Sequence, residues 1–249
     1  MQPDGLRVLI VGASSAVATE TARAYAERGA RLVVTARTPE RGEAVAADLR
    51  VRGAADVRAL TLDVTDHAGS TGVIDVAWAA FGGFDVALLA AGVLPDQPRC
   101  EADGATALAA LDVNFVGLVA LLTPLANRFE AAGRGCIAVI GSVAGDRGRQ
   151  SNYVYGAAKG GLDRFLQGLR NRLYRSGVAV VTLKPGFVDT PMTAAMAQGP
   201  LFVSARRAGR SIYRAIERRR DVAYVPWFWR PIMLVVRAIP ERVFKRLRL

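Results

Sequence analysis

The chain has 249 residues, of which 51% are hydrophobic, so it is long and apolar enough to bury the full core of one domain. Its net charge is +11, and residues 204–249 hold 13 Lys and Arg against 3 Asp and Glu, so nearly all the excess lies at the C-terminal end. The chain has one histidine, His67, and two cysteines, Cys100 and Cys136, and they do not have the spacing of metal ligands. We therefore expect no metal site, and we expect the cysteines to be reduced, packed thiols.

Six short runs rich in Val, Leu and Ile alternate with longer segments of helical period. The predicted strands are residues 6–11, 31–36, 57–62, 84–90, 136–141 and 178–183. Strands that are apolar on both faces belong to buried parallel sheets, and alternation with helices implies right-handed crossovers. We therefore predict an α/β fold with one Rossmann-like, doubly wound parallel sheet over residues 1–225, followed by a basic, aromatic extension over residues 226–249. The chain does not open with the charged segment and apolar run of a secretory signal peptide, so we expect a cytoplasmic protein.

The first strand leads directly into "VGASSAVA", residues 11–18, and then into a helix. A strand, a turn of small residues and a helix N-terminus present backbone N–H groups to a pyrophosphate. Gly12 suits the tight turn, while Ala16 and Ala18 stand where glycine is usual in dinucleotide sites. The candidate cofactor residues of this segment are Gly12, Ser14, Ser15 and Val17.

The end of the second strand indicates which dinucleotide binds. An acidic residue there would hold both ribose hydroxyls of NAD, but this chain has Ala36 followed by Arg37. Arg37, together with Arg41, can bind the 2′-phosphate of NADP(H), the cofactor we predict; a solvated arginine is the alternative. Asp63, at the end of the third strand, is placed either to accept from the adenine amino group or to cap a helix, a role that Asp66 could also fill.

Four stretches carry candidate chemistry in chain order. Asn114 lies in "LDVNFVG", Ser142 follows the fifth strand, "YVYGAAKGG" holds Tyr155 and Lys159, and "LKPGFVDTPM" holds Pro185, Gly186 and Thr190. Helix positions four apart share a face, so Tyr155 and Lys159 can face one site, while Tyr153 is expected to be wall and not acid. The combination resembles the short-chain dehydrogenase/reductase family across about residues 6–225.

This resemblance implies roles for these residues. Tyr155 would donate the proton to a carbonyl oxygen, and Lys159 would lower the pKa of that phenol and bind the nicotinamide ribose. Ser142 would be the second donor to the carbonyl, Asn114 would hold a water of the proton relay, and Thr190 would bind the carboxamide of the cofactor. Further cofactor-binding residues implied in this way are Val64, Ala91, Gly92, Pro185, Gly186 and Val188.

The region after Thr190 suggests the kind of substrate. The resemblance implies that residues 191–203 form the substrate loop, and because they are apolar and nearly uncharged, we expect an apolar substrate wall. Residues 204–220 predict a capped helix with an arginine-rich side. After a short strand at 222–225, residues 227–239 are too few to cross a bilayer. Tryptophans beside arginines are typical of an interfacial segment. The alternative is an extension that packs Trp227, Phe228 and Trp229 over the active site or into an oligomer contact.

We predict an NADPH-preferring ketone reductase or alcohol dehydrogenase. The ending resembles the branch of the family that reduces the 2-keto group of a decaprenylphosphoryl pentose, which implies a lipid-linked ketone and peripheral contact of residues 226–249 with an anionic membrane, at its inner face. The alternatives are a soluble carbonyl reductase for small or acyl substrates, a catalytically silent dinucleotide-binding relative and a nucleic-acid binder. The last lacks an interleaved aromatic platform, so we expect no nucleic-acid partner. The family also implies a homodimer or homotetramer paired through the helix of Tyr155.

Overall fold

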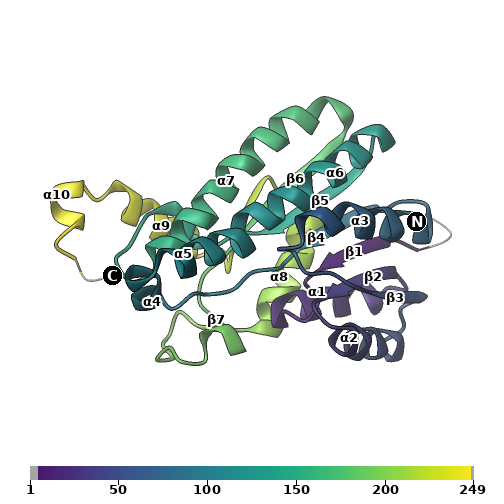
Figure 1. Cartoon of the computed structure of the whole chain (residues 1–249), viewed down its shortest axis with the longest axis horizontal. Helices are drawn as coiled ribbons and strands as arrows, with labels where there is room; N and C mark the ends of the chain where they lie inside the picture. Colours follow the sequence, from purple (N-terminus) through teal and green to yellow (C-terminus); the bar gives the residue numbers. More distant parts are fainter. Residues whose placement is uncertain (1–4, 248–249) are drawn as a thin grey trace.

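All seven strands of the main sheet run parallel, in the order β3-β2-β1-β4-β5-β6-β9 (Figure 1). The computed structural model describes residues 5–247. The first four residues of the predicted domain, 1–4, and the last two of the predicted extension, 248–249, lie outside the described residues. The strands are β1 (Arg7–Val11), β2 (Arg31–Ala36), β3 (Asp56–Thr61), β4 (Val86–Leu89), β5 (Gly135–Ile140), β6 (Val178–Pro185) and β9 (Val222–Val225). The order reverses direction between β1 and β4, which confirms the predicted doubly wound sheet.

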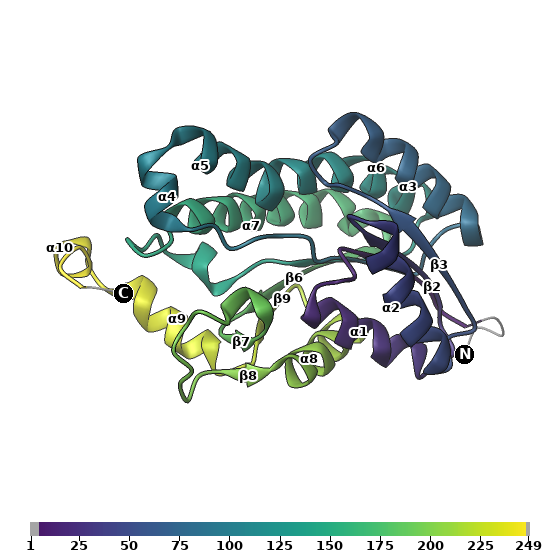
Figure 2. The same ribbon diagram turned by 60° about the horizontal axis from the view of Figure 1, so that its bottom comes forward.

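Helices cover both faces of the sheet (Figure 2). One face packs against α1 (Ala16–Ala26), α2 (Pro39–Val51) and α8 (Ala205–Glu217). The other packs against α3 (His67–Phe81), α6 (Gly117–Ala132) and α7 (Tyr153–Leu173), and the shorter α4 (Gln97–Ala102) and α5 (Gly104–Leu111) precede α6. Successive strand residues point to opposite faces, so Val8 and Ile10 enter one core cluster and Leu9 and Val11 the other.

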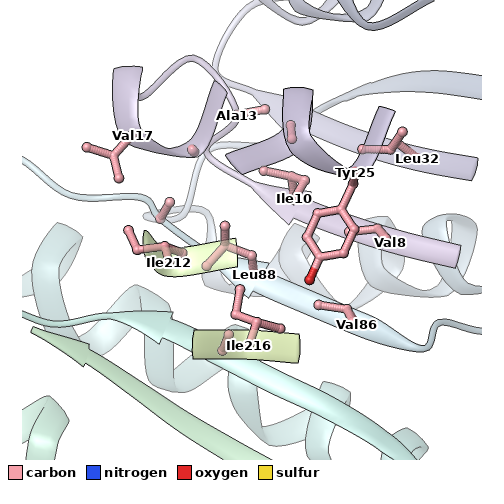
Figure 3. Packing of buried hydrophobic residues seen from close by; sticks show 14 of the residues in the cluster. Val8, Ile10, Ala13, Val17, Tyr25, Leu32, Val86, Leu88, Ile212 and Ile216 are labelled. Atoms are coloured by element: carbon pink, nitrogen blue, oxygen red, sulfur yellow. The ribbon is translucent and has the colours of Figure 1, made fainter. Parts of the chain in front are cut away.

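The predicted amphipathic helix after residue 204 is α8. Ser204 caps it by accepting from the Arg207 amide at 3.3 Å. Its buried residues include Ile212 and Ile216, which point toward Leu88 of the sheet and the ring of Tyr25 from α1 (Figure 3). This packing turns the arginines of α8 outward.

A continuous helical run over residues 104–132 joins α5, a π-helical turn η1 (Asp112–Val116) and α6. By length and composition alone this run could cross a bilayer. One side of it packs in the core, however, where Leu118, Leu121 and Phe129 have no exposed surface. Core helices of soluble domains pass the same test, and the run contributes to the helical layer that covers the sheet.

The C-terminal extension begins after β9 and forms α9 (Trp229–Ala238) and α10 (Glu241–Phe244). Both helices lie at the end of the molecule opposite the N-terminus (Figures 1 and 2). Trp229 and Met233 are each 4% exposed and pack with Val143, next to the predicted donor Ser142. Trp227, by contrast, is 74% exposed.

Arg147 fastens the extension to the body of the protein. Its Nη1 donates to the carbonyl oxygens of Val236, Arg237 and Ile239 at 3.3, 3.0 and 2.7 Å, at the end of α9. Its Nη2 donates to Glu241 at 2.8 Å. The guanidinium carbon lies 3.9 Å from the centroid of the Phe244 ring. The extension is therefore packed at Trp229 and Phe244, whereas Trp227, which the packing alternative also named, is exposed.

The two cysteines are both free and buried, as predicted. Burial raises the pKa of the Cys136 thiol to about 12. A thiol of such high pKa stays protonated at neutral pH and acts as a small apolar side chain.

Candidate active site

A cavity of about 610 Å³ opens where the parallel strands end, at the point where the strand order reverses. Its wall includes the last residues of β1, β2, β5 and β6, namely Val11, Ala36, Ile140 and Pro185. The cavity brings together all but one of the site residues predicted from the sequence. Those that line it are Gly12, Ser14, Ser15, Val17, Arg37, Asp63, Val64, Ala91, Gly92, Ser142, Tyr155, Lys159, Pro185, Gly186, Val188 and Thr190.

The turn between β1 and α1 is shaped to hold a pyrophosphate. Gly12 has a φ of +74°, and a Cβ there would lie 2.8 Å from the Ala91 amide nitrogen, so only glycine fits. The Gly12 amide donates to the Thr35 hydroxyl at 3.3 Å. Ser14 and Ser15 then bring the first turn of α1 to the cavity, where its N–H groups can bind an anion.

Arg37 and Asp63 lie at the ends of β2 and β3 and border the same part of the cavity. The Arg37 side chain is exposed, and no ion pair or hydrogen bond engages it among the described residues. Asp63 accepts from the Thr65 amide and hydroxyl at 2.9 and 2.7 Å, and these bonds hold the pKa of its carboxyl below the usual range. The residue that caps α3 is Asp66, which accepts from the Gly69 amide at 2.9 Å.

Ser142, Tyr155 and Lys159 all line the cavity. Ser142 follows β5 and its hydroxyl accepts from the Ala144 amide at 3.1 Å. The Ser142 hydroxyl is also near enough to Tyr155 to favour the ionised phenol. Lys159 is 3% exposed, and its Nζ lies 5.7 Å from the centroid of the Tyr155 ring and donates to the Ile140 carbonyl oxygen at 3.1 Å. Tyr153 is 46% exposed and does not line this cavity, so the expectation that it forms wall is wrong.

Burial controls the ionisation of the tyrosine and lysine. It raises the pKa of Tyr155 to about 12, and the neighbouring Ser142 hydroxyl, which lowers this pKa, opposes the effect of burial only in part. Burial also lowers the pKa of Lys159 to about 8. The predicted lowering of the Tyr155 pKa by Lys159 is therefore not found in this structure. The ammonium group donates to Ile140 and not to the phenol, so desolvation is the larger effect.

A buried ion cluster lies beside this site. Lys184 of β6 donates to Asp146 at 2.6 Å and to Asp163 at 3.0 Å, and all three side chains are less than 10% exposed. Asp146 ends the 3-10 turn η2 (Val143–Asp146) that follows Ser142, and Asp163 lies one turn after Lys159 on α7. The cluster thus connects the elements that carry the serine and the lysine. Gly145 of the same turn approaches α7 so closely that a Cβ would lie 2.7 Å from the Lys159 carbonyl carbon.

Asn114 is the predicted site residue that does not line the cavity. It is fully buried in the π-helical turn η1, a feature often found at functional sites. Its Nδ2 donates to the carbonyl oxygens of Val93 and Ala110, both at 2.9 Å, and its Oδ1 accepts from the Val93 amide at 3.1 Å. Both amide hydrogens are used within the protein, so the side chain fixes the loop after β4 at the cavity wall.

The cavity also contains polar residues that the sequence did not single out, Arg149 and Asn152. Arg149 Nε and Asn152 Oδ1 are buried, and neither has a hydrogen-bond partner in the described part of the chain. Burial also lowers the pKa of the Arg149 guanidinium. Both residues lie in "RQSNY", immediately before α7, the helix that carries Tyr155 and Lys159. This position in the sequence is the signal by which they could have been identified as site residues. Apolar side chains complete the wall, among them Phe187, Met192 and Met196.

Thr190 and Gly186 lie at the end of the cavity that follows β6. The Thr190 amide donates to the Thr193 hydroxyl at 3.3 Å, which fixes the short turn η4 (Pro191–Thr193). The indole of Trp229 packs against Gly186 and leaves no room for a side chain there. Its ring centroid is 5.2 Å from that of Phe187. The C-terminal extension therefore supports the cavity wall from behind.

Comparison with known proteins agrees with this geometry. A sequence profile described as short chain dehydrogenase matches residues 7–200. An uncharacterized oxidoreductase of Mycobacterium tuberculosis is 39% identical over 240 residues, which cover 96% of each chain. A cis-4-hydroxycyclohexanecarboxylate dehydrogenase of Sinomonas cyclohexanicum is 32% identical and matches 86% of this chain and 85% of its own. A short chain dehydrogenase of Burkholderia cenocepacia, solved in complex with NADP, has a TM-score of 0.82, covers 100% of both chains and is 22% identical, which shows a shared fold.

Proposed function

Because this chain belongs to the short-chain dehydrogenase family, we propose that it uses NADP(H) to interconvert a ketone and a secondary alcohol on a substrate that carries an anionic group. Membership makes the chain an oxidoreductase that acts on a CH–OH group with a nicotinamide dinucleotide. The observation that carries the proposal is the meeting of Ser142, Tyr155 and Lys159 at one end of a cavity whose other end fits a dinucleotide.

The cofactor fits the residues present. The glycine turn at Gly12 and the start of α1 can bind the pyrophosphate, and Arg37, which is exposed and makes no ion pair or hydrogen bond with the described residues, can pair with a 2′-phosphate. Asp63 is left to accept from the adenine amino group, since Asp66 caps the helix. The structural relative from Burkholderia cenocepacia was solved with NADP, which agrees with the same preference here.

The residues of the site divide the chemistry between them. When bound, the nicotinamide of the cofactor supplies or accepts the hydride. Ser142 donates a hydrogen bond to the substrate carbonyl oxygen, and Tyr155, whose raised pKa keeps it protonated at neutral pH, gives that oxygen its proton. Lys159 is placed to bind the nicotinamide ribose and to offset negative charge on the phenol after the proton has left.

Arg149 is the reason to propose an anionic substrate. A partly buried guanidinium whose Nε lacks a hydrogen bond within the described chain gains most from a carboxylate or phosphate that enters the same cavity. The relative from Sinomonas cyclohexanicum is named for an alcohol that bears a carboxylate. A polyprenylphosphoryl keto-sugar joins a keto group to a phosphate and an apolar chain, which suits Arg149, Met192 and Met196 together.

Two expectations from the sequence remain proposals, a cytoplasmic location and a homodimer or homotetramer. The exposed apolar side chains of the helical run 104–132 favour pairing of two copies on that side: Leu108 is 67% and Val116 44% exposed. Sedimentation of the purified chain would distinguish a dimer or tetramer from a monomer.

A substrate screen with NADPH tests the proposed function. It should compare polyprenylphosphoryl keto-sugars and 4-oxocyclohexanecarboxylate with cyclohexanone, a neutral ketone of the same ring size. Turnover of the anionic ketones is expected to exceed that of cyclohexanone. Arg149→Ala should lower kcat/KM roughly 150-fold for the anionic ketones only, because one charge-assisted contact of about 3 kcal/mol is lost. Equal losses on both classes would refute the anion contact. Binding of NADPH without turnover of any ketone would favour the catalytically silent alternative, and preference for cyclohexanone would favour a general carbonyl reductase.

A further inference from the structure

The outward side of α8 and the turn after it form a groove of about 620 Å³ that we name the arginine groove. Its lining includes Arg206, Arg207, Arg210, Arg214, Arg218 and Arg220. Trp227, the second residue of the extension, also lines it. The buried side of α8 holds Ala208, Ile212 and Ile216 against the sheet, so the arginines cannot turn inward.

No carboxylate neutralises this groove within the described residues. The acidic residues of this region have other partners: Glu217 accepts from the Tyr25 hydroxyl at 3.2 Å, Asp221 lies 3.6 Å from Arg170 Nε, and Glu241 pairs with Arg147. The guanidinium groups of the six arginines make no ion pair and no hydrogen bond in the part of the chain that the structure describes. So many unpaired cations of one sign create a field that attracts an anionic partner.

A second copy of this chain does not fit the groove. A two-fold symmetric contact through α8 would place the arginines of one copy against those of the other, which repel. Trp227, which lines the groove, is 74% exposed, and α9, which follows it in the chain, also exposes apolar side chains, with Leu234 59% and Val235 67% exposed. An exposed tryptophan beside arginines is typical of a contact with the headgroup region of a membrane.

The groove also adjoins the catalytic cavity along the chain. The segment that carries Met192 and Met196 of the cavity wall continues through β8 (Val203–Ser204) into α8. Ser204 lines the arginine groove and caps the helix. A surface bound to α8 would therefore lie near the segment proposed to contact the substrate.

We propose that the arginine groove, together with Trp227 and the exposed side of α9, docks the protein on an anionic phospholipid bilayer. The positive charge that attracts the membrane comes from α8. Residues 226–249, which the sequence predicted to contact the membrane, supply the apolar side chains. This proposal does not depend on the substrate proposed above. Each arginine near an anionic membrane contributes a factor of about five in affinity, so several acting together give salt-sensitive binding.

Flotation of the full chain with lipid vesicles tests the docking surface. One set of vesicles is phosphatidylcholine alone. The other is phosphatidylcholine with roughly 30 mol % of the anionic lipid phosphatidylglycerol. We expect binding to the anionic vesicles at low salt, loss of it at roughly 0.5 M salt, and none to the neutral vesicles.

Arg210→Glu/Arg214→Glu should weaken binding to anionic vesicles roughly 30-fold or more. The matched control is Arg99→Glu/Arg175→Glu, which changes the net charge equally at exposed positions outside the groove and should have less than about a three-fold effect. NADPH-dependent reduction of a soluble ketone should be unchanged in both variants, which shows that they fold. Equal losses in the two double variants, equal binding to neutral vesicles, or displacement by duplex DNA at the same salt concentration would overturn the proposal.

Discussion

Trp229 offers a direct test of whether the C-terminal extension is part of the folded protein. The side chain is 4% exposed and packs against Val143, Gly186 and Phe187. Truncation of a buried Trp to Ala destabilises a protein by about 3–5 kcal/mol. At roughly 2–4 °C per kcal/mol for a chain of this size, we expect Trp229→Ala to lower Tm by about 10 °C.

A second substitution at the same position separates packing from polarity. The Nε1 of Trp229 is buried without a hydrogen-bond partner among the described residues, a state that costs about 1–3 kcal/mol. Trp229→Phe removes this nitrogen and keeps most of the apolar surface, so its free energy of unfolding should lie within about 1 kcal/mol of that of the parent.

Guanidinium unfolding of the two variants measures these changes, with Trp227→Ala as the control because that side chain is 74% exposed. The control should change stability by no more than about 0.5 kcal/mol. A loss below about 1 kcal/mol for Trp229→Ala, or equal losses at both positions, would show that α9 is not docked.

Three further predictions concern the cofactor, the ion cluster and the tyrosine. Arg37→Asp should weaken NADPH binding by about 3 kcal/mol, roughly 150-fold, and leave NADH nearly unchanged, as measured by fluorescence titration; equal effects would refute the 2′-phosphate contact. Lys184→Met leaves Asp146 and Asp163 buried without their cation and should cost about 3–5 kcal/mol in urea unfolding, most of it recovered when both aspartates become Asn. A Tyr155 pKa of about 12 makes the deprotonated phenol scarce at neutral pH, and Lys159, with a pKa of about 8, loses its charge above that pH, so alcohol oxidation should rise from about pH 6 to about pH 8 and then level off, while ketone reduction does not rise. A flat oxidation profile would contradict that assignment.

The sheet could be predicted because its central strands are buried on both faces. Runs such as Leu32 to Val34 have no exposed surface, so their sequence shows uninterrupted apolar character and marks each strand within about two residues. Parallel strands then bring their carboxyl ends to one edge, which is why separate segments containing Gly12, Ser142 and Tyr155 line one cavity.

The contacts that the sequence did not reveal all join distant segments. Arg147 binds carbonyl oxygens 89 to 92 residues further along the chain, and nothing in the local pattern names that partner. Lys184 likewise meets its two carboxylates only after η2, α7 and β6 have packed together. The position of Asn114 in a π-helical turn depends on its bonds to Val93, which also lie outside its own helix.

The central claim is that Tyr155 gives the proton to the substrate oxygen, and Tyr155→Phe tests it most directly. Steady-state turnover and NADPH binding should be measured on the same purified variant. Turnover should fall by about 10³-fold or more, while the NADPH dissociation constant changes less than about three-fold. A variant that keeps more than about a tenth of the parent turnover would contradict the account.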